Sequence, residues 1–147
     1  MAYKTLYSRI EGYNIALEGI LEEPLFGWGP SIFPQYYDLK EGIWASQHTH
    51  NMPLELAFNY GLPTSIILNI FVLLLIKNAY IKCYESSFNK NIFTIDKAWI
   101  TASLIVVVSH LFDITYYEGK ISLLIWILLA GLKCIIDDKS IKKSNIN

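Results

Sequence analysis

The chain has 147 residues, of which 53% are hydrophobic and 17% are charged, and its formal net charge is -1. This composition is too apolar and too poor in charge for an ordinary soluble domain. The balanced charge also argues against a nucleic-acid partner.

The N-terminal residues predict an amphipathic helix that Pro24 ends. The stretch TLYSRIEGYNIALEGILEEP places its large apolar side chains on one face at helical spacing, namely Leu6, Ile10, Tyr13, Leu17 and Ile20. Arg9 lies at the border of that face. Two interpretations of Arg9 are open: its guanidinium enters a protein cleft, or it extends along lipid headgroups.

A loop follows this helix. Residues 24–34, PLFGWGPSIFP, are rich in glycine and proline and predict turns. No GxxxxGK[ST] motif is present, so this is not a phosphate-binding loop of that kind. Trp28 and Trp44 are candidate substrate-binding residues, because aromatic rings stack on sugars. The alternative is that both anchor the loop at a membrane interface.

The segment ASQHTHNMPLELAFNYGLP predicts a second short helix. Asn51 fits its N-cap, Pro53 fits its first turn, and Gly61 fits the position after its end. His50 therefore lies just before a helix N-terminus, with His48 two residues earlier. The helix dipole there favours a bound anion such as a phosphate and favours neutral imidazole. A neutral histidine beside an anion site suits a general base.

Two other interpretations of these histidines are open. A His-x-His pair could bind zinc if Asp38, Glu41 or Glu55 supplied a third ligand, but no spacing fixes that ligand, and we predict no metal. Alternatively, His48 and His50 are polar residues that cap a helix at an interface.

Three stretches are apolar enough to span a membrane, namely residues 62–81, 98–117 and 121–136. Lysines are concentrated in two places, after the first stretch and after the third: Lys82, Lys90, Lys97, Lys133, Lys139, Lys142 and Lys143. The positive-inside rule places both regions in the cytoplasm, including the basic tail 137–147. Residues 1–61 are then extracytoplasmic. The predicted fold is an all-α integral membrane protein with two short amphipathic helices before three transmembrane helices.

A few polar residues interrupt the predicted spans. His110 and Asp113 share a helical face near the outer end of the second span, where we interpret them as solvated at the interface. Asn69 is deeper, and we expect a hydrogen bond to another helix. Cys83 and Cys134 lie near the reducing cytoplasmic face, so no disulfide is expected.

The predicted topology requires export of residues 1–61, yet no signal peptide or earlier span precedes them. We therefore expect the chain to be the C-terminal piece of a longer polytopic protein. The missing N-terminal spans would be a partner if a separate chain supplies them.

Several segments resemble a known family. SRIEGYNIALEGILEEPLFGWGP, HTHNMPLELAFNYGLP and the apolar stretch after them resemble the C-terminal half of the O-antigen ligase and O-antigen polymerase superfamily. SHLFDITYYEGKISLLIWILLAGL is similar to the last two spans of a cyanobacterial branch. The resemblance covers essentially the whole chain. Thr64 departs from it, because members usually have glycine after GLP.

The resemblance implies a membrane glycosyltransferase of the GT-C type in the bacterial inner membrane, acting at the periplasmic face without metal or cofactor. The donor would be a glycan linked to undecaprenyl diphosphate. The acceptor would be lipid A core for a ligase, or another glycan for a polymerase. By position, Arg9 matches an arginine that binds the diphosphate, and His50 matches the general base. His48 and Asn51 are expected beside the substrate.

Two alternatives belong to different classes of protein. One is a non-catalytic membrane remnant or assembly subunit of the same ancestry. The other is an unrelated small membrane protein whose N-terminal helix lies on the lipid surface.

Overall fold

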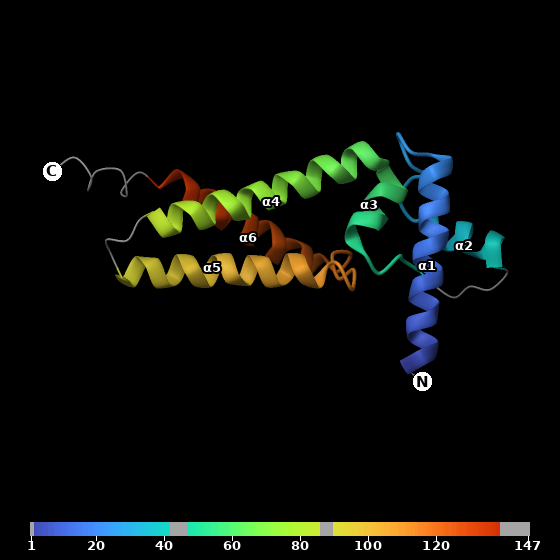
Figure 1. The fold of residues 1–147 in the computed structure, drawn as a ribbon, viewed down its shortest axis with the longest axis horizontal. Helices are drawn as coiled ribbons and strands as arrows, with labels where there is room; N and C mark the ends of the chain where they lie inside the picture. The colour runs from blue at the N-terminus through green and yellow to red at the C-terminus, as the bar shows by residue number, and fades with distance from the viewer. Residues whose placement is uncertain (1, 42–46, 86–89, 139–147) are drawn as a thin grey trace. The chain divides into compact units, whose positions relative to one another are not determined.

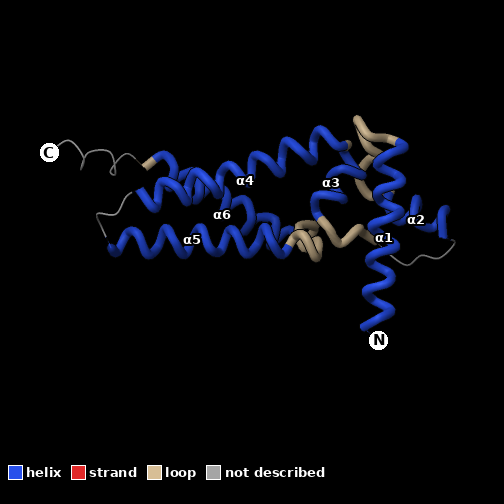
Figure 2. The backbone as a smooth tube through the Cα atoms, viewed as in Figure 1, coloured by secondary structure: helices blue, strands red, loops and turns tan. Residues whose placement is uncertain are grey.

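The computed structural model describes residues 2–41, 47–85 and 90–138, which form six α-helices and contain no strand. The all-α prediction is confirmed at this level (Figures 1 and 2). In chain order the helices are α1 Ala2–Glu22, α2 Phe33–Glu41, α3 Met52–Tyr60, α4 Leu62–Glu85, α5 Lys90–Ser109 and α6 Gly119–Asp137. The chain divides into two compact units. Unit 1 is residues 1–69 with 109–114, and unit 2 is residues 70–108 with 115–147.

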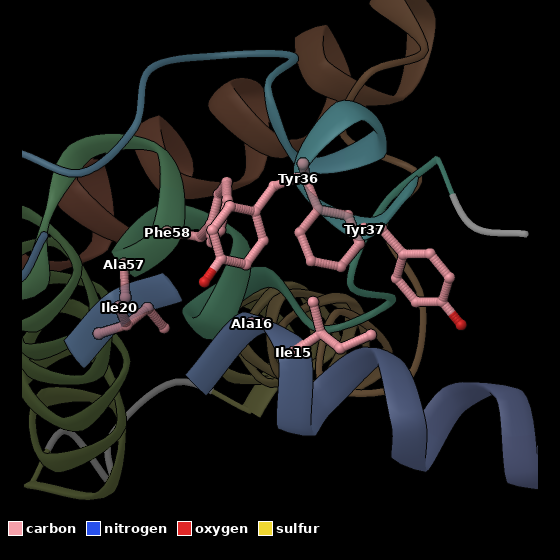
Figure 3. Close-up of a cluster of buried hydrophobic side chains, with 8 residues drawn as sticks. Ile15, Ala16, Ile20, Tyr36, Tyr37, Ala57 and Phe58 are labelled. Carbon is pink, nitrogen blue, oxygen red and sulfur yellow. The ribbon is translucent and has the colours of Figure 1, made fainter. Parts of the chain in front are cut away.

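The core of unit 1 is an aromatic cluster between α1, α2 and α3 (Figure 3). The Phe58 ring meets the Phe33 ring edge-on at a centroid distance of 5.2 Å, and it meets Tyr36 at 5.4 Å. Gly19 on α1 leaves room for the Phe58 ring, because a Cβ at Gly19 would lie 2.5 Å from that ring. The cluster contains eight buried residues: Ile15, Ala16, Ile20, Phe33, Tyr36, Tyr37, Ala57 and Phe58.

The buried face of α1 differs from the apolar face expected from the sequence. Ile20 is buried, but Ile10 and Leu17 are about half exposed. The helix instead packs through Ala16 and Gly19, which are small enough to admit the aromatic rings of the other helices. The predicted face was chosen from the large apolar residues alone. Small residues such as Ala16 and Gly19 were not counted, so the observed packing face differs from the predicted one.

Helix α2 begins inside the stretch that the sequence predicted as a loop. Pro34 is its second residue, where a missing backbone N–H does not interrupt helical hydrogen bonding. Lys40 in its last turn forms ion pairs with Glu18 at 3.5 Å and Glu22 at 3.3 Å, both on α1. These exposed pairs contribute little stability, so the aromatic core holds α2 in place.

Two helices in the described part of the chain are long and apolar enough to cross a membrane by length and composition, Leu62–Cys83 and Gly119–Asp137. Only 17% and 22% of their most apolar windows is buried, so most of the side chains in those windows are not covered by the rest of the protein. Both helices fall on predicted spans, which supports a membrane protein. The third span is not confirmed. Helix α5 ends at Ser109, and residues 110–117 of the predicted stretch lie outside it.

Unit 2 contains a close contact between α5 and α6. The Trp99 indole N–H donates to the Leu128 carbonyl at 2.9 Å. Gly131 makes room for that ring, since a Cβ at Gly131 would lie 2.1 Å from the indole nitrogen. Small residues permit this kind of close helix approach in membrane proteins.

Candidate functional site

Helix α3 begins at the predicted N-cap. The Asn51 backbone is extended, and its side-chain Oδ1 accepts the Leu54 N–H at 3.0 Å. Pro53 occupies the first turn, and Gly61 follows the helix with a φ of 85°. The Gly61 N–H donates to the Ala57 carbonyl at 2.9 Å. The local capping signals in the sequence therefore predicted this helix correctly.

A buried carboxylate fixes the chain in front of α3. Glu55 is only 3% exposed, and its Oε2 accepts the Thr49 backbone N–H at 3.0 Å. Its Oε1 accepts from the Asn59 side chain at 3.2 Å. Glu55 was a possible metal ligand in the sequence, but in the structure its two oxygens hold Thr49 and Asn59. The result is a fixed backbone directly before His50.

The backbone carbonyls of residues 110–112 accept hydrogen bonds from this segment and from Arg9. The Met52 N–H donates to the His110 carbonyl at 2.8 Å, and the Asn51 Nδ2 donates to the Leu111 carbonyl at 3.0 Å. The Arg9 guanidinium donates to the Phe112 carbonyl at 3.3 Å. This turn therefore joins the first and third helices of unit 1. If α5 continued past Ser109, the carbonyls of residues 110–112 would accept hydrogen bonds from N–H groups of that helix. Here they accept from Met52, Asn51 and Arg9.

The same turn places Asp113 against His50. The His50 Nδ1 lies 3.1 Å from Asp113 Oδ1, which also accepts the Ile114 backbone N–H at 2.8 Å. The hydrogen bond from His50 is the main cause that holds the pKa of Asp113 below its usual value. The Ile114 N–H and the positive charge of Arg9 act in the same direction, and partial burial opposes them. Asp113 is therefore a carboxylate at neutral pH.

This pairing sets the proton positions on the imidazole. A carboxylate only accepts hydrogen bonds, so Nδ1 of His50 must carry the hydrogen. In neutral imidazole the lone pair then lies on Nε2, the nitrogen that could accept a proton from a substrate. The His50 side chain is 35% exposed, which leaves it accessible. His50 also has a φ of 52°, an uncommon backbone conformation for a residue other than glycine.

Arg9 and His50 are thus attached to neighbouring residues of one turn, Phe112 and Asp113. In the described part of the chain, Arg9 forms no ion pair with a carboxylate. Its hydrogen bond goes to a neutral carbonyl, and its charge acts on the Asp113 carboxylate without a direct ion pair. A guanidinium in that state can bind a phosphate through two parallel hydrogen bonds.

The N-terminus of α3 offers an anion its dipole but not its first backbone donors. The Met52 N–H donates to the His110 carbonyl, and the Leu54 N–H donates to the Asn51 side chain. Pro53 has no N–H. Both polar atoms of the Asn51 side chain are already hydrogen-bonded: Oδ1 accepts from the Leu54 N–H, and Nδ2 donates to the Leu111 carbonyl. The expected contact between Asn51 and substrate stays a prediction.

The remaining predicted site residues lie in different surroundings. The His48 and His50 ring centroids are 6.4 Å apart, in an edge-on arrangement. Trp28 packs on Tyr36 at 5.1 Å, and its indole N–H donates to the Gly19 carbonyl at 2.8 Å, while the residue stays 36% exposed. Trp44 lies outside the described residues. Contacts of these side chains with a sugar stay predictions.

Among the side chains that the structure describes, no group of three or more His, Cys, Asp or Glu residues is arranged to hold a metal ion. A third zinc ligand beside His48 and His50 is therefore not found among them. Glu41, one of the suggested ligands, has a side chain outside this described set.

Asp113 is the site residue that the sequence did not assign. Its spacing from His110 suggested a shared helical face, but its partner in the structure is His50. An ionisable residue beside an apolar stretch was the one available signal.

Comparison of the chain with protein-family models, with curated proteins and with solved structures found no match.

Proposed function

We propose that the chain is the C-terminal part of an O-antigen ligase-like or polymerase-like enzyme. Such an enzyme transfers a glycan from an undecaprenyl-diphosphate-linked donor to a hydroxyl of a glycan or lipid acceptor in the bacterial inner membrane. The observation that carries the proposal is the hydrogen bond between His50 and Asp113, next to the Arg9 contact with Phe112. The two helices with membrane-spanning length and composition support a lipid-linked substrate.

The proposed chemistry assigns the base to His50. Its Nε2 takes the proton of the acceptor hydroxyl while that oxygen attacks the anomeric carbon of the donor glycan. The bond between the anomeric carbon and the diphosphate oxygen breaks, and the diphosphate leaves with the electron pair. Asp113 holds the ring by Nδ1 and stabilises the imidazolium that forms.

Arg9 has the complementary role in the proposal. Negative charge on the diphosphate increases as the glycosyl bond breaks, and a positioned guanidinium stabilises that charge. Because the first N–H groups of α3 are already used within the protein, Arg9 carries most of this stabilisation in the described chain. A permanently charged arginine supplies it without a metal.

The test is glycan transfer in membranes of the source strain in which the native chain is replaced by a variant. His50→Ala is expected to lower the transfer rate by about 10²- to 10⁴-fold, the usual effect of a general base. His48→Ala is the comparison variant, because the proposal gives the nearby His48 a substrate contact but no role in proton transfer, so its loss of rate should be smaller. Arg9→Lys keeps the positive charge but cannot form the bidentate hydrogen bonds that a guanidinium makes with a phosphate, so it should weaken donor binding.

Wild-type transfer by both His50→Ala and Arg9→Ala, with normal protein levels, would refute the enzymatic proposal. The chain would then be better explained as a non-catalytic assembly subunit or remnant. An equal loss in His48→Ala and His50→Ala would refute the specific assignment of the base.

A further inference from the structure

The last turn of α1 and the turn that follows it present large apolar side chains to solvent. Leu21 is 77% exposed, Leu25 is 63% exposed and Phe26 is 83% exposed. These three residues, which we call the apolar turn, belong to unit 1. Three large apolar residues exposed together mark an interaction surface more strongly than one does.

The apolar turn is fixed to the first residue of α4. The Leu62 N–H donates to the Pro24 carbonyl at 2.8 Å. The following residues are held as well, because the Trp28 N–H donates to the Phe58 carbonyl at 2.8 Å and the Gly29 N–H donates to the Asn59 carbonyl at 3.0 Å. The turn therefore has a defined position at the point where α3 ends and α4 begins.

Gly61 brings the two backbones into direct contact. A Cβ at Gly61 would lie 2.1 Å from the Leu25 carbonyl oxygen and 2.9 Å from the Phe26 nitrogen. Its φ of 85° also disfavours any other residue type. The backbone of the apolar turn thus lies directly against the beginning of α4.

Helix α4 also exposes large apolar side chains in its first turns. Leu62 is 38% exposed, Ile66 is 52% exposed and Ile67 is 68% exposed. The stretch Leu62–Cys83 has the length and composition of a membrane span. The apolar turn therefore lies at the depth where such a span would meet the lipid headgroups.

We propose that the apolar turn inserts into the bilayer at the boundary between headgroups and acyl chains, and so fixes the depth of unit 1 against the membrane. The occupant of this surface is bilayer lipid. Attraction to anionic lipid would not drive the insertion, because the neighbouring charged residues include the acidic Glu22 and Glu23. The inference rests on α4 crossing the membrane, and it holds whether or not the chain transfers glycan.

The test uses the full chain without its native cysteines, as Cys83→Ala with Cys134→Ser, reconstituted in phosphatidylcholine vesicles. A polarity-sensitive fluorophore is attached at Phe26→Cys in one sample and at Leu39→Cys in another. Leu39 is the matched control, because it is 87% exposed but lies on α2 and is not part of the apolar turn. Aqueous iodide and brominated lipid acyl chains serve as the two quenchers.

In vesicles we expect a severalfold loss of iodide quenching at position 26 relative to position 39, with quenching by bromine placed near the headgroups. In concentrated denaturant without lipid the two positions should become equal, which controls for the fluorophore itself. Equal iodide quenching at both positions in vesicles would overturn the proposal. Shielding of position 26 that requires anionic lipid, or that high salt removes, would also overturn it.

Discussion

His50 and Asp113 share a hydrogen bond of 3.1 Å, although 63 residues separate them in the chain. The turn that carries Asp113 reaches His50 because hydrogen bonds from Met52 to His110 and from Asn51 to Leu111 hold it there. The imidazole orientation therefore depends on residues from both parts of the sequence that make up unit 1.

Replacing Asp113 with asparagine should reduce glycan transfer. The neutral amide cannot stabilise the imidazolium of His50, and the loss of a charge-assisted hydrogen bond corresponds to about a 10- to 100-fold lower rate. The measurement is the pH–rate profile, because a positioning residue changes its shape and not only its height. Asp137→Asn is the matched control, since Asp137 is an exposed acid that pairs with Lys133 on α6. A normal profile for Asp113→Asn would contradict the assignment.

The lowered pKa of Asp113 predicts an acid-sensitive contribution to the stability of unit 1. A depressed folded-state pKa stabilises the protein above the unfolded value of about 3.9, and this contribution is lost as the pH falls through the folded value. Because the Asp113 side chain is 57% exposed, we expect at most about 1 kcal/mol. The measurement is the unfolding free energy of the wild type and of Asp113→Asn at decreasing pH. Below about pH 3.9, where the carboxylate itself becomes protonated, the difference between them should shrink, and a difference that does not shrink there would show that the hydrogen bond from His50 does not lower this pKa.

Two substitutions of Asn51 should separate its two hydrogen bonds. Asn51→Ala removes both the cap on Leu54 and the bond to Leu111, at a cost of about 1 kcal/mol for the cap alone. Asn51→Asp keeps an oxygen for the cap but cannot donate to the Leu111 carbonyl. We expect the aspartate variant to retain the helicity of α3, measured by hydrogen exchange at Leu54, and to lose protection of the 110–113 turn. Equal protection of that turn in both the wild type and Asn51→Asp would show that the backbone bond from Met52 suffices.

Glycine-to-alanine substitutions should have opposite effects at two positions. Gly61→Ala forces a side chain against the Leu25 carbonyl at an unfavourable φ, so it should destabilise unit 1 by more than about 1 kcal/mol. Gly12→Ala lies within α1 with nothing within 4 Å of the added Cβ, so it should stabilise by about 0.5–1 kcal/mol. Thermal unfolding in mild detergent measures both. Destabilisation by Gly12→Ala would indicate a contact on that face of α1 that the structure does not contain.

Substitution of Gly131 should disturb the contact between α5 and α6. Gly131→Ala places a methyl group against the Trp99 indole and should cost about 1–3 kcal/mol through overpacking. The double variant with Trp99→Phe should recover part of that loss, because a smaller ring leaves room for the methyl group. The measurement is a double-mutant cycle of unfolding free energies. Additive effects would mean that the two residues do not share the contact.

Local signals in the sequence were sufficient for α3 and for the two helices of membrane-spanning character. Asn51, Pro53 and Gly61 act within a few residues of themselves, and a run of apolar residues needs no partner to be recognised. The all-α fold class follows from such local patterns.

The features that sequence reasoning missed depend on contacts between distant residues. Ala16 and Gly19 form a packing surface because Phe58 fits against them, which no pattern within α1 reveals. Asp113 could not be paired with His50 because α5 was expected to continue past Ser109. Beyond Ser109, the carbonyls of His110 and Leu111 accept hydrogen bonds from Met52 and Asn51.

The distance along the chain between His50 and Asp113 has a consequence for biosynthesis. At typical elongation rates of about 5–20 residues per second, on the order of 3–13 s pass between the synthesis of the two residues. During that interval α4 and α5 are made, while His50 still lacks its carboxylate partner. A ribosome stalled before residue 113 would therefore leave the His50 imidazole without the hydrogen bond that orients it in the complete chain.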